Sequence, residues 1–105
     1  GGDGLVWQAQ GTRERFLLFV HQLTPPQRRR PQPLLLPFLD DVPRHVSLLR
    51  ASGLGGAYRY PLPPLFAAMQ AAPQCFAGSW LRGAGLPMPM LRAEGAAVFL
   101  FEATE

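Results

Sequence analysis

Lysine, isoleucine and asparagine are missing from the sequence, and cysteine occurs once in 105 residues. All ten basic residues are therefore arginine, which we attribute to a GC-rich coding sequence because the codons of the three missing residues are rich in A and T. The single cysteine, Cys75, excludes an internal disulfide. Since free thiols are typical of reducing compartments, we expect an intracellular domain, either cytoplasmic or nuclear.

Long hydrophobic runs are also missing. The longest are FLLFV and AAVFLF, which have the length of a strand and fall far short of the roughly 18 apolar residues that span a bilayer. The composition is nevertheless 48% hydrophobic, enough for a core without disulfide or metal staples. We expect a single domain over residues 1–105, excised from a larger protein because the chain opens with GGDG.

Basic charge is concentrated in one place. The formal net charge is +3, from ten arginines and seven acidic residues. Without the triplet Arg28, Arg29 and Arg30 the balance is seven against seven (10 − 3 = 7). The triplet stands in TPPQRRRPQP, residues 24–33, whose prolines exclude a helix or a central strand. This segment predicts a mobile, Pro- and Arg-rich surface loop with some polyproline II geometry.

The N-terminal third predicts a β-hairpin. Residues 5–10 alternate in polarity, and residues 15–23, RFLLFVHQL, are rich in aromatic and aliphatic side chains. In a strand, Phe16, Leu18 and Val20 would share one face. A helix beginning at Thr12 is the alternative for the second segment.

Two helices are predicted in the middle of the chain. Asp40 and Asp41, followed by Pro43, resemble a capped helix start, and Gly53 resembles its end. A second helix is expected over residues 63–72, since prolines occupy its start and alanines raise helix propensity. Residues 74–86 carry several glycines and remain ambiguous.

The C-terminal segment predicts a second hairpin, from Met88–Ala93 to Ala96–Glu102, with Gly95 supplying a positive φ in the turn. Its second strand is continuously apolar, so we expect both of its faces to be covered. The expected fold is α+β: a small two-layer domain in which N- and C-terminal hairpins form an antiparallel sheet, with about two helices on one face.

No catalytic, cofactor-binding or metal site is predicted. His21, His45 and Cys75 are too few and too distant in sequence for a structural zinc site. Cys75 could be combined with His45 and Asp41 as a nucleophile, base and orienting group. However, it adjoins Phe76 in an apolar stretch and is interpreted as a small core residue. Without lysine, no phosphate-binding P-loop exists.

The favoured function is a non-catalytic protein–protein interaction or scaffold domain that binds another protein, or itself, through surplus apolar surface or a sheet edge. One alternative is a nucleic-acid-binding module based on the arginine loop, aided by Arg13, Arg15 and Arg59. The other is a non-catalytic fragment of an enzyme. The predicted partner-binding residues are Arg28, Arg29, Arg30, Trp80, Met88 and Met90.

Overall fold

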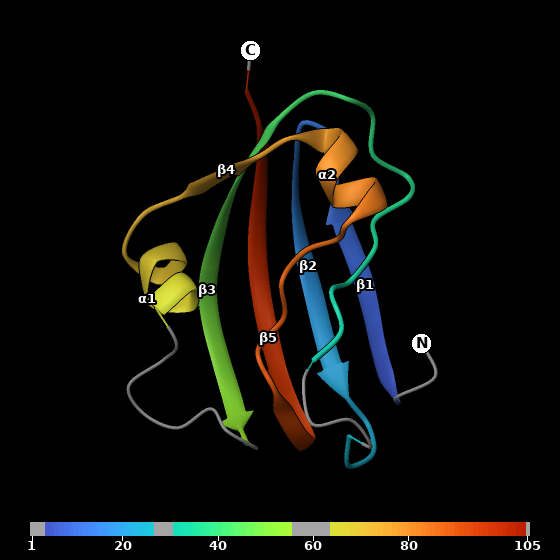
Figure 1. Ribbon diagram of the computed structural model, residues 1–105, viewed down its shortest axis with the longest axis vertical. Coiled ribbons are helices and arrows are strands. Elements are labelled where there is room, and N and C mark those ends of the chain that lie inside the picture. Colours follow the sequence, from blue (N-terminus) through green and yellow to red (C-terminus); the bar gives the residue numbers. More distant parts are fainter. Residues whose placement is uncertain (1–3, 27–30, 56–63, 105) are drawn as a thin grey trace.

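The computed structural model describes residues 4–26, 31–55 and 64–104, which form a five-stranded antiparallel sheet with two helices (Figure 1). The strands lie in the order β1-β2-β5-β3-β4. The elements are β1 (Leu5–Gly11), β2 (Arg15–Gln22), β3 (Arg44–Leu54), α1 (Pro64–Ala71), β4 (Gln74–Phe76), α2 (Gly78–Gly83) and β5 (Leu91–Ala103). The expected antiparallel sheet with two helices is confirmed, and the domain is mostly sheet, with few helical residues.

The N-terminal hairpin is confirmed. β1 pairs with β2 in an unbroken register from Leu5 opposite Gln22 to Gly11 opposite Phe16. In β2, Phe16, Leu18 and Val20 are buried while the residues between them are more exposed. This period of two is that of a strand with one covered face, so the helical alternative for this segment is wrong.

The first expected helix is wrong, because its residues form β3. Val46 and Leu48 point into the core while His45 and Leu49 are exposed, an alternation that a helix cannot produce. The carboxylate of Asp40 does bind a following backbone N–H, that of Val42, at 3.0 Å. This hydrogen bond closes a local turn before a strand rather than the first turn of a helix. An aspartate side chain can accept such a bond in either setting, so the residue alone does not distinguish them.

The expected C-terminal hairpin is also wrong. Its residues form one long strand, β5, which lies between β2 and β3 at the centre of the sheet (Figure 1). The chain continues past residues 94–95 because a bulge absorbs the irregularity: Ser52 faces Ala96, whereas Leu54 faces Leu91.

The positive φ expected at Gly95 lies instead at the residue before it. Glu94, and not Gly95, has the positive φ, of 68°. Gly95 is required for close approach of backbones instead, because a Cβ there would lie 2.9 Å from the carbonyl oxygens of Ser52, Gly53 and Arg92. The turn signal at this position therefore marks a bulge within a strand.

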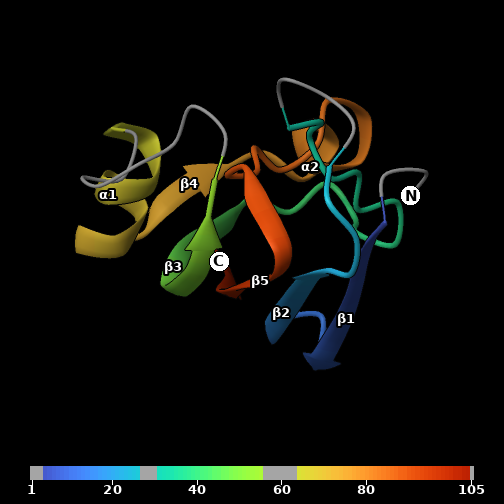
Figure 2. The same cartoon turned by 90° about the horizontal axis from the view of Figure 1, so that it is seen from below.

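Both helices lie on the same face of the sheet (Figure 2). The second expected helix is confirmed as α1, which buries Phe66 and Met69, and the ambiguous segment forms β4 and α2. At the centre of the core, the rings of Phe16 and Phe101 stack with centroids 4.6 Å apart. Neither helix in the described part of the chain could span a membrane.

The Pro- and Arg-rich segment is described only at its two ends, since Gln27–Arg30 lie outside the described residues. Residues 31–33 have no regular structure. The chain then joins the fold at Leu34, which forms an isolated antiparallel bridge with Leu86.

Candidate protein-interaction surface

One face of the sheet, here called the open face, carries neither helix (Figure 2). Its apolar character comes from β2 and β5, whose residues are apolar on both sides of the strand. Leu17 faces Leu100 across the β2–β5 pair, and Phe19 faces Val98. Directly opposed side chains on one face of an antiparallel pair lie in contact range, so these four residues form a continuous apolar stripe.

Two further apolar side chains extend this stripe. Val6 on β1 lies opposite His21, which is two residues from Phe19 on β2. Leu49 lies in the bulge of β3, directly before Arg50, and Arg50 is the register partner of Val98. Phe19 is 38% exposed, and Val6 and Leu49 are more exposed still. We call this set the open-face patch: Val6, Leu17, Phe19, Leu49, Val98 and Leu100.

Charged pairs border the open-face patch at both ends. At one end, Arg15 Nε lies 3.2 Å from Glu102 Oε2, between register partners on β2 and β5. At the other end, His21 Nε2 lies 3.7 Å from Glu94 Oε2. An apolar centre with a polar border is the usual anatomy of a protein–protein contact surface.

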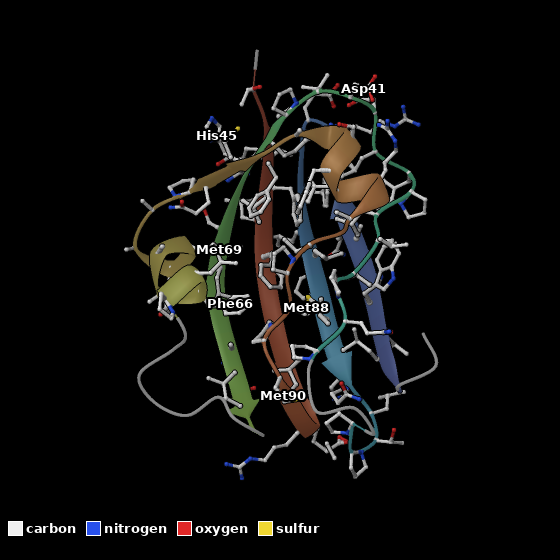
Figure 3. The ribbon with its side chains drawn as sticks, in the orientation of Figure 1. Asp41, His45, Phe66, Met69, Met88 and Met90 are labelled. Carbon is white, nitrogen blue, oxygen red and sulfur yellow. The ribbon has the colours of Figure 1, made fainter. Side chains whose placement is uncertain are left out.

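Met88 and Met90 do not belong to any accessible surface, which corrects their assignment as partner-binding residues. They are 4% and 5% exposed and lie in the segment that crosses the covered face before β5 (Figure 3). The flexible thioether side chain suits this position, because it fills irregular space between a sheet and loops. Methionine is frequent at protein interfaces, which favoured the partner-binding interpretation, but the same flexible side chain is equally suited to a core.

Trp80 is accessible, with 54% of its surface exposed, and lies on α2. Since α2 packs on the covered side of the sheet, Trp80 is separated from the open-face patch by the whole layer (Figure 2). Its proposed contact with a partner therefore belongs to a different side of the molecule and stays a prediction.

The arginine triplet, Arg28 to Arg30, lies outside the described residues, as does Arg59. Two other arginines pair with carboxylates of the same chain, whereas the side chain of Arg13 forms no ion pair in the described part of the chain. Arg15 pairs with Glu102, and Arg82 Nη2 lies 2.5 Å from Asp41 Oδ1. The nucleic-acid alternative thus stays a prediction that depends on residues 28–30.

His45 and Cys75 lie directly opposite each other on β3 and β4, a juxtaposition that sequence distance did not suggest. Both side chains are exposed, and in the described residues no hydrogen bond joins them. Asp41 lies at a distance from His45 and pairs with Arg82 (Figure 3). Nucleophilic catalysis needs a nucleophile, base and orienting group within hydrogen-bond reach, and this arrangement does not provide it.

Metal ligands are not gathered either. Among residues 4–26, 31–55 and 64–104, no group of three or more His, Cys, Asp or Glu side chains is placed to hold an ion. The open-face patch is the set of exposed apolar side chains that the strand register brings together on the sheet. Its signal in the sequence is the consecutive apolar residues of FLLFV and VFLF, which place apolar side chains on both faces of their strands.

Known proteins do not supply an independent assignment. No protein-family model matches the chain, and comparisons with curated proteins and with solved structures found no match.

Proposed function

We propose that the domain is a non-catalytic protein-interaction module that binds another protein through the open-face patch. The observation that carries the proposal is the opposition of Leu17 to Leu100 and of Phe19 to Val98 on the sheet face that neither α1 nor α2 covers. Apolar surface in water costs about 25 cal/mol per Å² relative to burial. A contiguous exposed apolar patch therefore favours binding to another apolar surface, whereas single exposed apolar residues are common on any protein.

The partner is expected to offer a complementary apolar surface with polar groups at its margin. The charges that border the patch are already paired, Arg15 with Glu102 and His21 with Glu94. They therefore fix orientation more than they add affinity. Binding should depend weakly on salt, in contrast to phosphate recognition, which weakens steeply as salt rises.

The test uses a photoreactive benzoylphenylalanine in place of Phe19, with the same residue in place of exposed Gln70 on α1 as the control position. In the source cells, the Phe19 position should give a discrete protein adduct that the Gln70 position does not give. Adding Leu17→Asn to the labelled chain should remove the adduct while the melting temperature stays within a few degrees.

Three results would contradict the proposal. The same adducts at both positions would show non-specific contact, and no adduct at Phe19 would show that the patch is unoccupied. An adduct that disappears on nuclease treatment would favour the nucleic-acid alternative.

A further inference from the structure

β1 forms one edge of the sheet, and in the described residues no strand lies beyond it (Figure 1). Edge strands of natural proteins are protected from further pairing by charge, proline, a bulge or short length. β1 has none of these: its seven residues, LVWQAQG, are uncharged, lack proline and pair with β2 without a register shift. The opposite edge, β4, is protected, because it has only three residues and follows Pro73.

The backbone hydrogen bonds show which groups of β1 face the open edge. Thr12 and Arg15 exchange N–H···O bonds of 2.9 and 3.2 Å, and the Leu23 N–H donates to the Gly4 carbonyl at 2.8 Å. In an antiparallel ladder, hydrogen-bonded pairs alternate with non-hydrogen-bonded pairs. The even-numbered residues of β1 therefore bond to β2, and the backbone groups of Trp7 and Ala9 point outward.

We propose that a second copy of this chain pairs with β1 along this edge, antiparallel and about a two-fold axis at Gln8. This register overlaps residues 6–10 of the two strands. It places Trp7 opposite Ala9 of the second copy, as a pair whose outward N–H and C=O groups bond to each other. The two five-stranded sheets then become one sheet across the dimer.

A second copy fits because the strand is complementary to itself about that axis. A large residue meets a small one on each side of the axis, because Trp7 of each strand meets Ala9 of the other. No charges are brought together, since β1 has none. A two-fold interface uses the same surface on both subunits, so this self-complementarity is the property that it requires.

The covered side of the edge supplies apolar area to the same contact. The indole of Trp7 stacks on the ring of Phe38 with centroids 5.8 Å apart, and Trp7 is still 37% exposed. The second copy would cover this stacked pair. On the other side of the sheet, Val6 would bring the two open-face patches next to each other.

This inference rests on the proposed function in taking a protein as the ligand, and it names that ligand as the chain itself. The surface differs, however. The dimer uses the β1 edge and includes only Val6 of the open-face patch, so the rest of the patch stays accessible and the two proposals can fail separately.

The test is a charge exchange at Gln8, measured by sedimentation velocity over a range of concentrations. The Gln8 side chains would face each other across the axis as a non-hydrogen-bonded pair, in which side chains lie closest. Gln8→Lys and Gln8→Glu should each weaken dimerisation, by about tenfold or more in Kd, because like charges would be opposed. An equal mixture of the two variants should restore the dimer.

Gln70→Lys is the charge control, since Gln70 is exposed on α1 and lies outside the proposed interface. It should leave the dimer largely intact. Ala9→Pro is a second variant: it removes an outward N–H without removing a bond to β2, as edge positions tolerate. It should give a folded monomer.

A wild-type chain that stays monomeric at every concentration would overturn the inference. So would a dimer that both Gln8 variants leave unchanged. If Leu17→Asn dissociates the dimer and the Gln8 variants do not, the copies meet through the open-face patch, and only the edge inference fails. If charge exchange succeeds but Phe19 gives no adduct with another protein, only the proposed function fails.

Discussion

Arg44 is almost fully buried, and its Nη1 lies 2.5 Å from Oδ1 of Asp40. The same guanidinium donates to the carbonyl oxygens of Val42, at 2.7 Å, and Arg13, at 3.1 Å, while its buried Nε has no hydrogen-bond partner among residues 4–26, 31–55 and 64–104. One side chain thus ties the start of β3 to the turn between β1 and β2. A buried charge is expensive unless it is paired, so the Asp40 carboxylate is the critical partner.

Asp40→Asn should lower the free energy of unfolding at neutral pH. In the variant, the free energy of unfolding should also decrease less steeply as the pH is lowered. The hydrogen bond from Arg44, followed by that from the Val42 N–H, lowers the pKa of Asp40 from its ordinary value of 3.8. A carboxyl with a lowered pKa in the folded state adds stability above the unfolded value, and this is lost as pH falls through the folded value. Urea denaturation at a series of pH values below about 5 would measure this.

Asp41→Asn is the control for this prediction. Asp41 pairs with Arg82 at an exposed position, and surface ion pairs contribute little. If both variants change the pH dependence of the free energy of unfolding below about pH 5 by the same amount, the Arg44 contact has no special role.

Phe99→Ala should lower the free energy of unfolding by about 3–5 kcal/mol, the usual range for deleting a buried aromatic side chain. Phe99 is fully buried on β5, with Leu18 and Leu48 as its neighbours on β2 and β3. Val98→Ala, one residue away on the open face, should cost less, because that side chain is only partly buried. Equal losses in chemical denaturation would contradict the assignment of the two faces.

Gly95→Ala and Gly83→Ala should have opposite effects. A Cβ at Gly95 would press on three carbonyl oxygens at 2.9 Å, and overpacking of this kind costs about 1–3 kcal/mol. A Cβ at Gly83 would meet nothing within 4 Å. Alanine there should be neutral or stabilising by up to about 1 kcal/mol, because it restricts the unfolded chain. Thermal unfolding of both variants gives the comparison, and a harmless Gly95→Ala would contradict the close approach of strands at the bulge.

Replacing Arg28, Arg29 and Arg30 together with alanine should leave the melting temperature nearly unchanged, since surface substitutions usually shift stability by less than about 0.5 kcal/mol. The same variant separates the functional alternatives. Loss of salt-dependent binding to single- or double-stranded nucleic acid would support the basic-loop alternative. A drop of many degrees would show instead that the loop is packed.

The sequence predicted those elements whose signals are local. Alternation identified β2, and the proline start with alanines identified α1, because these patterns depend on neighbouring residues alone. The helix predicted from Asp40 and the hairpin predicted from Gly95 were wrong because the signals of these residues are not specific to one local structure. A carboxylate that binds a nearby N–H, and a glycine after a polar residue, are compatible with several backbones, and pairing with distant strands decided between them.

The open-face patch was predictable as a surplus of apolar side chains but not as a location. Phe19 and Val98 are 79 residues apart (98 − 19 = 79), and only the strand order brings them together. The burial of Met88 and Met90 could not be foreseen for the same reason, since it depends on where their irregular segment crosses the sheet.

The position of β5 imposes an order of assembly on the polypeptide. It supplies the only partner that joins the N-terminal hairpin to β3 in the described residues, yet it is the latest of these strands to be synthesised. Until residue 103 has left the ribosome, the two halves of the sheet have no common neighbour, and their apolar strands remain open to unwanted pairing. Formation of the sheet should therefore wait for β5 and be limited by long-range contacts, and a chain shortened before β5 should aggregate rather than retain a partial sheet.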